Sequence, residues 1–207
     1  MKSTYYLFIN GKLFLSNLES DVYNMRAFIA VDLVDENIKM GILKIQKALS
    51  QSGSNLKSVK PQNLHFTIHF LGEINEQEVT NISCILKDLD VSSFRISFRG
   101  LGYFPNSRRI SVIWVGVDNG EKEFVELANQ IEKKLVQMNY SSDRQFLPHL
   151  TVCRVKTGRN KDQLIHAVEE FSDMNLGMTM VSSVKLKKSL LTPEGPIYTD
   201  IYEKVLK

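Results

Sequence analysis

The chain has 207 residues and a formal net charge of +3, and its 43% hydrophobic and 24% charged residues make an ordinary globular composition. This length suits one compact domain or two closely joined lobes with a substantial core. The two cysteines give no disulfide framework and no CxxC pattern, and no apolar run approaches the roughly 18 residues of a membrane span. We therefore expect a cytoplasmic protein that binds no membrane.

The first 24 residues stand apart from the rest of the chain. Apolar stretches at 5–9 and 14–15 flank Asn10-Gly11, the residue pair that most favours a two-residue hairpin turn. A signal peptide is disfavoured because Asn-Gly-Lys breaks the apolar stretch and no small-residue cleavage site follows. We predict an N-terminal extension at 1–24, either a hairpin or disordered, followed by a single bilobal domain at 25–207.

From residue 25 onward, strand-like and helix-like segments alternate. Two helices have predicted N-caps, Asp35 in one case and Asn75 with Glu78 in the other. Residue type and apolar periodicity predict, in order, strand 26–32, helix 38–49, strand 64–71, helix 76–89, strand 94–99, strand 109–117, helix 124–138, strand 148–155 and helix 164–171. A long strand from Thr179, a Pro-Gly-Pro turn and a closing strand complete the chain.

A short motif, His-x-Thr, occurs in both halves, as His65-Phe66-Thr67 and as His149-Leu150-Thr151. The two histidines are 149 − 65 = 84 residues apart, and the same shift carries strands 26–32 and 94–99 and helix 76–89 onto segments that were assigned independently. The pattern is therefore duplicated, although residue identity is low. We predict an α+β fold of two βαβαβ lobes related by a pseudo-two-fold axis, with largely antiparallel sheets around a central cleft and helices outside.

Two histidines on opposite walls of a cleft can act as the acid and the base of one reaction at phosphorus. Because imidazole titrates near neutral pH, one ring can take a proton from the nucleophile while the other protonates the leaving oxygen. Thr67 and Thr151 share a strand face with the histidines, so their hydroxyls could donate to phosphate oxygens. Such a site requires no metal and suits a phosphodiester with an alkoxide leaving group, for example a nucleoside 2′,3′-cyclic phosphate.

Other polar residues have simpler interpretations. His69 lies four residues beyond His65, roughly 13 Å along a strand, which is too far for a shared metal. Arg154 could contact a phosphate or a base, but strict alternation places it on the face opposite His149 unless the strand contains a bulge. A lysine cluster near the C-terminus is interpreted as the charge of an edge strand: Lys185, Lys187 and Lys188.

The strings HFTIHFLGE and PHLTVCRVK, with RAFIAVDL before them and SLLTPEGPIY after them, resemble the two-histidine (2H) phosphoesterases. Within that superfamily they resemble the RNA 2′,3′-cyclic 3′-phosphodiesterases, also called 2′-5′ RNA ligase-like proteins. The resemblance covers Met25 to about Lys207. It implies a bilobal α+β fold and hydrolysis of RNA 2′,3′-cyclic phosphate ends to 2′-phosphates, with no metal and no other cofactor.

The resemblance also implies the roles of the motif residues. His65 with Thr67 would form one half of the site and His149 with Thr151 the other half. His65 would be the proton donor to the departing O3′, and His149 would be the base that activates water. Swapping these two roles leaves the sequence unchanged, so the pair is implied more directly than its direction.

Two further residues and the partners follow from the same resemblance. Arg154 corresponds to the family's trailing arginine, and Phe28 falls where an aromatic ring could stack on a base. The expected partner is RNA with a 2′,3′-cyclic phosphate end, tRNA included, or a small cyclic nucleotide. We also expect the chain to act as a monomer.

Other functions are compatible with the same residues. The chain could be a non-catalytic module that binds nucleotides or RNA ends, although intact His-x-Thr motifs in both halves argue against a pure binder. It could also be a 2′-5′ RNA ligase acting on tRNA halves, because ligation reverses the hydrolytic chemistry with an RNA 5′-hydroxyl in place of water.

Overall fold

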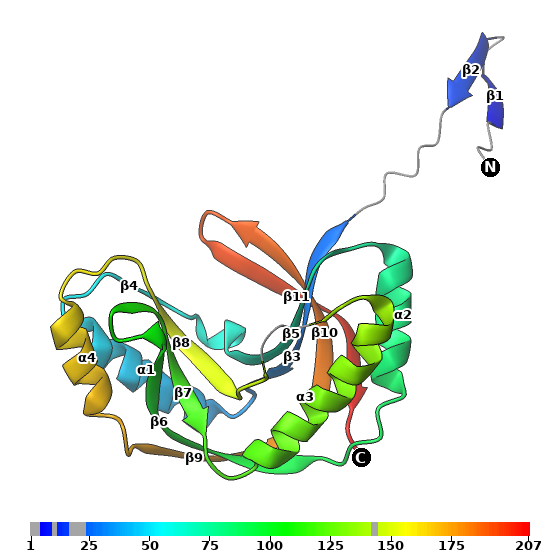
Figure 1. Cartoon of the computed structure of the whole chain (residues 1–207). Coiled ribbons are helices and arrows are strands. Elements are labelled where there is room, and N and C mark those ends of the chain that lie inside the picture. The colour runs from blue at the N-terminus through cyan, green and yellow to red at the C-terminus, as the bar shows by residue number, and fades with distance from the viewer. Residues whose placement is uncertain (1–4, 10–11, 17–23, 142–144) are drawn as a thin grey trace.

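The computed structural model describes residues 5–9, 12–16, 24–141 and 145–207 (Figure 1). The strands are β1 (Tyr5–Ile9), β2 (Lys12–Ser16), β3 (Met25–Asp32), β4 (Leu56–Ser58), β5 (His65–Ile74), β6 (Phe94–Asn106), β7 (Arg109–Val117), β8 (His149–Val155), β9 (Asn175–Val181), β10 (Ser183–Thr192) and β11 (Gly195–Val205). The α-helices are α1 (Glu36–Ser50), α2 (Glu76–Lys87), α3 (Glu121–Leu135) and α4 (Lys161–Glu169). Short 3₁₀ turns lie at Pro61–Asn63 and Val136–Met138.

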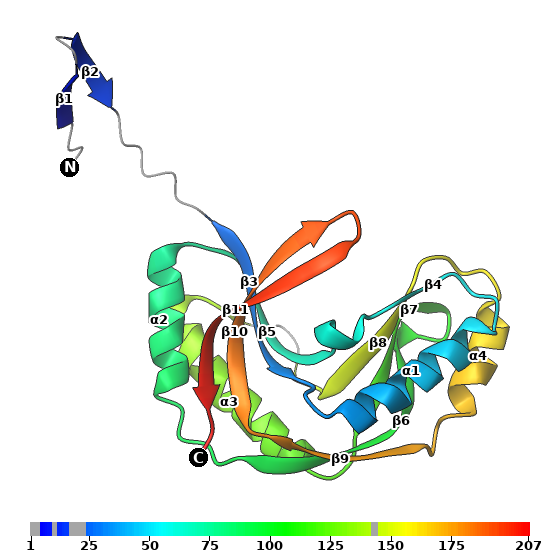
Figure 2. The ribbon, with the colours of Figure 1, turned by 180° about the vertical axis from the view of Figure 1, so that it is seen from behind.

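Two sheets with antiparallel pairing form the body of the fold (Figure 2). The strand order is β11-β10-β3-β5 in the first sheet and β4-β8-β7-β6-β9 in the second. The edge strand β5 of the first sheet lies against β8 of the second, so the two strands that begin with the histidines are neighbours. The predicted α+β class with largely antiparallel sheets is confirmed.

Each lobe combines elements from both halves of the sequence. The shift of 84 residues relates β3 to β7 and β5 to β8, and these pairs occupy corresponding places in the two sheets. However, β6 of the first half pairs with β7, whereas β10 of the second half pairs with β3. The helices are exchanged in the same way, since α1 packs against α4 and α3 packs against α2. The exchange ties both halves into one unit.

The two helices with predicted N-caps, α1 and α2, begin at those caps. The side chain of Asp35 accepts a 3.0 Å hydrogen bond from the backbone N–H of Ile38 at the start of α1. At α2, Asn75 accepts from the backbone N–H of Glu78 at 3.0 Å, and Glu78 accepts from the backbone N–H of Asn75 at 2.8 Å. Each cap of this kind stabilises a helix by about 1 kcal/mol.

Three segments differ from the sequence prediction. The segment between the predicted helix at 38–49 and the predicted strand at 64–71, to which no element was assigned, contains β4, which pairs with β8. The strand predicted at 94–99 continues through Gly100, Gly102 and Pro105, because β7 pairs with it from Phe98 to Asn106 and irregularities absorb the breaks in register. The predicted long strand from Thr179 is divided, since β9 belongs to the second sheet and β10 to the first.

The core runs continuously behind both sheets. Phe66 of β5 packs against Phe98 of β6 and Phe124 of α3, with ring centroids 5.9 Å and 4.9 Å apart, and all three side chains are almost completely buried. Phe66 lies between His65 and Thr67 in sequence, so this contact anchors the first His strand from behind.

The N-terminal segment is described only in part. The backbones of β1 and β2 pair antiparallel. The predicted Asn10-Gly11 turn and residues 17–23 lie outside the described residues, and the division into an extension at 1–24 and a domain at 25–207 stays a prediction. Within the described residues, no helix combines the length and apolarity that crossing a membrane requires.

Candidate active site

The two histidines are held in the same way at the starts of β5 and β8. Nδ1 of His65 lies 2.7 Å from the carbonyl oxygen of Asn63, and Nδ1 of His149 lies 2.8 Å from that of Leu147. A carbonyl oxygen can only accept a hydrogen bond, so each Nδ1 carries a proton and donates it. The Nε2 atom of each ring is thereby left available for proton transfer.

Because side chains alternate along a strand, the His and Thr side chains of both motifs point away from the core. Phe66 and Leu150 are buried, whereas the His and Thr side chains on either side of them are partly exposed. Thr67 pairs with Ala30 of β3 and Thr151 pairs with Trp114 of β7, two positions that are again 84 residues apart. The structure therefore places all four predicted motif residues equivalently on the exposed faces of neighbouring strands.

A bulge in β8 settles the orientation of Arg154. Trp114 pairs with Thr151 and Ile113 with Cys153, so Val152 has no partner in the ladder. Val152 and Cys153 are both buried, and Arg154 emerges exposed on the face of His149. The bulge that is required to place Arg154 on the face of His149 is therefore present.

The first strand has the matching irregularity. Ala30 pairs with Thr67 and Ile29 with His69, so Ile68, at the position equivalent to Val152, has no partner in the ladder. The exposed residue that follows is Phe70, with 73% of its surface accessible. The sequence prediction missed this residue, and a count of positions across the bulge, 154 − 84 = 70, would have found it.

The His65 ring lies among aromatic side chains. Its centroid is 5.1 Å from that of Phe28 and 5.2 Å from that of Tyr198, which meets it edge-on. Phe28 exposes only 3% of its surface, so it has no free ring face for a base, contrary to the expected stacking role. Phe28 instead packs against the His65 ring and helps to hold it in place.

Charges from both lobes act on His65. Burial lowers the pKa of His65 from its ordinary 6.5, and the positive charges of Lys187 and Arg154 lower it further, whereas the hydrogen bond to Asn63 and the charge of Asp32 oppose this shift. Burial raises the pKa of Tyr198, and the positive charge of Arg154, which lies on the other His strand, opposes that shift. The charge of Arg154, three residues beyond the second motif, thus acts on residues around the first motif.

His149 has a less charged environment. Its ring centroid is 5.0 Å from that of Phe104, edge-on, and 6.3 Å from that of Trp114. The Trp114 ring rests against Gly102, where an added Cβ would lie 2.3 Å from the indole. Burial lowers the pKa of His149, and the hydrogen bond to Leu147 opposes the shift.

The lysines interpreted as an edge strand lie on β10, which is an interior strand between β11 and β3, so that interpretation is wrong. Lys187 is buried, and its Nζ lies 2.8 Å from Asp32 and 2.6 Å from Asp200. Nζ of Lys185 lies 2.7 Å from Asp200 and 3.1 Å from Asp32. Although burial opposes it, these contacts raise the pKa of Lys185.

No group of three or more His, Cys, Asp or Glu side chains among the described residues could hold a metal ion. His69 is buried on the other face of β5 from His65, and burial lowers its pKa.

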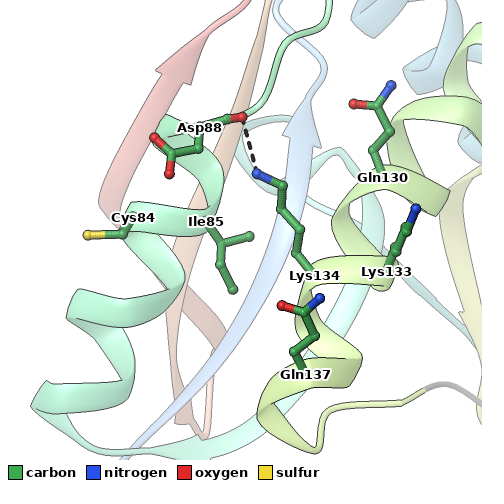
Figure 3. Close-up of a pocket in the computed structure, with 7 residues that line it drawn as sticks. All are labelled: Cys84, Ile85, Asp88, Gln130, Lys133, Lys134 and Gln137. Atoms are coloured by element: carbon green, nitrogen blue, oxygen red, sulfur yellow. Dashed lines mark hydrogen bonds between the residues drawn. The ribbon is translucent and has the colours of Figure 1, made fainter.

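A cavity lies away from the histidines, between α2 and α3. It has a volume of about 490 Å³, and Cys84, Asp88 and Lys134 are among its lining residues (Figure 3). Nζ of Lys134 donates to the Asp88 carbonyl at 3.2 Å. No histidine lines this cavity, so it offers no counterpart to the matched pair of imidazoles.

The match to known proteins agrees with the duplicated site. The family model described as LigT like Phosphoesterase matches the chain twice, at residues 31–114 and 115–198, and these matches are offset by 115 − 31 = 84 residues. The chain belongs to this family of phosphoesterases.

The curated relatives that it resembles include two archaeal proteins named RNA 2′,3′-cyclic phosphodiesterase. That of Methanothermobacter thermautotrophicus is 42% identical over 179 residues, covering 86% of this chain and 96% of the relative. That of Methanocaldococcus jannaschii is 40% identical over 179 residues, covering 86% of this chain and 99% of the relative.

Solved structures share the fold. TT0787 of Thermus thermophilus superposes with a TM-score of 0.74 at 27% identity, covering 88% of this chain and 98% of that one. Escherichia coli LigT complexed with 3′-AMP superposes with a TM-score of 0.69 at 21% identity, covering 89% of this chain and 98% of that one.

Proposed function

We propose that this protein hydrolyses RNA or nucleoside 2′,3′-cyclic phosphate ends to 2′-phosphates by acid–base catalysis between His65 and His149. The observation that carries the proposal is the identical tethering of the two rings, which leaves Nε2 of each free on neighbouring strands. The names of the curated relatives, at 40% identity and above, support the same reaction.

In the proposed reaction, His149 is neutral and its Nε2 takes a proton from the attacking water. His65 is doubly protonated and gives the Nε2 proton to O3′, so that the P–O3′ bond breaks and the 2′-phosphate remains. This direction follows the family resemblance. Burial lowers the pKa of both rings, and a bound phosphate anion beside His65 opposes that effect by favouring the protonated ring.

The remaining residues would position the phosphate and the base. The hydroxyls of Thr67 and Thr151 would donate to non-bridging oxygens, and the Arg154 guanidinium would neutralise their charge. Phe70 offers an exposed ring face beside the first motif for stacking on the base.

The proposal also covers the catalytic domain, its oligomeric state, its location and its substrates. We place the activity in a single catalytic domain at 25–207 that acts as a monomer in the cytoplasm, with RNA ends, tRNA included, as substrates. Nucleotide complexes of the structurally similar Escherichia coli LigT, with 3′-AMP and with ATP, are compatible with a nucleotide site in this fold.

The test is hydrolysis of 2′,3′-cyclic AMP in the presence of EDTA, with the 2′- and 3′-monophosphates separated. We expect 2′-AMP from the wild type and a loss of about 10² to 10⁴ in kcat for His65→Ala and for His149→Ala. His166→Ala, which removes a histidine with a largely exposed side chain on α4, is the matched control and should keep full activity. Unchanged turnover in either motif variant would refute the proposal.

A further inference from the structure

A second pocket, rich in positive charge, lies at the outer end of the second lobe. Its volume is about 190 Å³, and it is enclosed by the start of β7, the end of β8, the connection that follows β8, and the start of α4. In Figure 1 the turn between β6 and β7 lies beside the connection from β8 to α4 at this end of the molecule. Five cationic side chains line the pocket: Arg108, Arg109, Lys156, Arg159 and Lys161.

The charge in this pocket is not balanced by the protein. No acidic residue lines it, and within the described part of the chain no ion pair involves any of its five cations. The chain has 23 acidic residues, and it neutralises Lys185 and Lys187 closely with Asp32 and Asp200. Five like charges around one small pocket repel each other, so an anion bound there would gain attraction from all of them.

The start of α4 adds to this potential. Lys161 is the first residue of the helix, and the residue before it, Asn160, makes no side-chain hydrogen bond to the N-terminal N–H groups. A helix N-terminus carries a partial positive charge, and its free N–H groups are donors for phosphate oxygens.

Strand β8 leads from the candidate active site to the pocket. This strand begins at His149, exposes Arg154 on the same face and leads directly into Lys156. Lys156 is seven positions beyond His149, a span of roughly 23 Å at the rise of an extended strand. A mononucleotide at the histidines cannot cover this distance, whereas the phosphodiester backbone of an oligonucleotide can.

We propose that this basic pocket binds an internal phosphate of a single-stranded RNA whose 3′-terminal cyclic phosphate lies between His65 and His149. The inference rests on the proposed function and narrows its substrate class to oligoribonucleotides. The RNA backbone passes Arg154 on its way to the pocket, so the site selects chain length and not base sequence.

The experiment compares two substrates of the full-length protein, 2′,3′-cyclic AMP and an eight-nucleotide RNA that ends in a 2′,3′-cyclic phosphate. The pocket variant combines Arg108→Gln, Lys156→Gln and Arg159→Gln. The control variant removes the same charge from exposed positions on α2 and α3 by combining Lys87→Gln, Lys122→Gln and Lys133→Gln.

We expect the wild type to prefer the RNA. The pocket variant should show a decrease of about tenfold or more in kcat/KM for the RNA through KM, and log(kcat/KM) should fall less steeply with log salt, by roughly 0.7 for each phosphate that is no longer bound. Its activity on 2′,3′-cyclic AMP should stay unchanged, and the control variant should keep the preference for RNA. No preference for RNA in the wild type, or equal decreases in both variants, would overturn the inference.

Binding separates this inference from the proposed function. The same RNA ending in a 2′-phosphate, with a 5′ fluorophore, should bind the wild type about tenfold more tightly than the pocket variant by fluorescence anisotropy. Failure to hydrolyse 2′,3′-cyclic AMP with this binding difference intact would refute the proposed function alone. Equal binding by both proteins would refute the pocket.

Discussion

Phe70 and Arg154 occupy equivalent positions on the two His strands, 84 residues apart, and both side chains are exposed on the face that carries their histidine. Each follows a bulge, at Ile68 in β5 and at Val152 in β8. The duplicated backbone thus presents two different groups, an apolar ring beside His65 and a guanidinium beside His149. The two halves of the site have the same backbone arrangement but different side chains, which suits a ligand with a planar base and a charged phosphate.

Phe70→Ala should weaken the binding of a cyclic nucleotide. Loss of a base–aromatic stack costs about 1 to 3 kcal/mol, which corresponds to an increase in KM of roughly fivefold to a hundredfold. Because Phe70 is 73% exposed, the melting temperature should change little. Steady-state kinetics and thermal unfolding measure both quantities. Met178→Ala, at an exposed apolar residue of the second sheet, is the control, and an unaltered KM in Phe70→Ala would contradict the stacking role.

Arg154→Gln should raise the pKa of His65. The positive charge of Arg154 disfavours the protonated imidazole, so its removal makes protonation easier. NMR titration of the His65 ring measures this shift directly in the free protein, and the pKa of His69 serves as the internal control. The same variant should lose about tenfold or more in kcat/KM, because a charged contact to phosphate is worth about 1.5 to 3 kcal/mol. An unshifted His65 would show that the guanidinium does not act on this ring.

The division of roles predicts a bell-shaped pH profile of kcat/KM. Activity requires one ring protonated and the other neutral, so it should fall on both sides of an optimum, and the two limbs belong to the coupled pair. Because burial lowers the pKa of both free rings, the acid limb should lie below 6.5. Initial rates at subsaturating 2′,3′-cyclic AMP from about pH 4.5 to 9 would measure the profile. A monotonic profile would remove the acid–base division.

The local pattern of this sequence specifies much of the fold and the core of the candidate site. Period-two alternation and two capped helices fix the elements, and the repeat of His-x-Thr at 84 residues fixes the equivalence of β5 and β8. The placement of β10 beside β3 does not follow from local pattern, because these strands lie far apart in the sequence and only long-range pairing joins them. β6 pairs instead with β7, the strand that follows it in the chain.

The residues whose predicted roles differ from the structure differ from it in their burial. Phe28 and Phe70 are both aromatic residues near the first motif, and only their places on the packed sheet separate the buried support from the exposed ring. Lys187 is similar to its exposed neighbour Lys188 in sequence, yet β10 is an interior strand and its pairing turns Lys187 toward two carboxylates. Neither distinction can be obtained from residue type.

Lys187→Ala should destabilise the protein, because it leaves the charges of Asp32 and Asp200 without their most buried partner. Removing one member of a buried ion pair costs about 3 to 5 kcal/mol, and the remaining contacts of Lys185 place the expected loss near 3 kcal/mol. Urea unfolding measures the change in the free energy of unfolding. Lys188→Ala removes an exposed charge from the same strand and should be nearly neutral. Equal stability of the two variants would show that the network contributes little.

Stability should decrease as the pH falls below about 6.5. Burial lowers the pKa of three histidines in the folded protein, His65, His69 and His149, from an ordinary value of 6.5. Between the lowered pKa and 6.5 the unfolded chain binds more protons than the folded one, so the free energy of unfolding is fully retained above 6.5 and is lost as the pH falls through the folded pKa. Each histidine contributes a slope of at most about 1.4 kcal/mol per pH unit.

His69 allows this linkage to be tested away from the candidate catalytic pair. His69→Gln removes one of the three titrating groups, so the slope of the free energy of unfolding between about pH 5 and 6.5 should become shallower, whatever the variant does to stability at higher pH. Urea unfolding at each pH measures that slope. His166→Gln, at a side chain that is 78% exposed, is the matched control for the exchange of histidine for glutamine. If the His69 variant kept the wild-type slope, proton binding on unfolding would have to come from other groups.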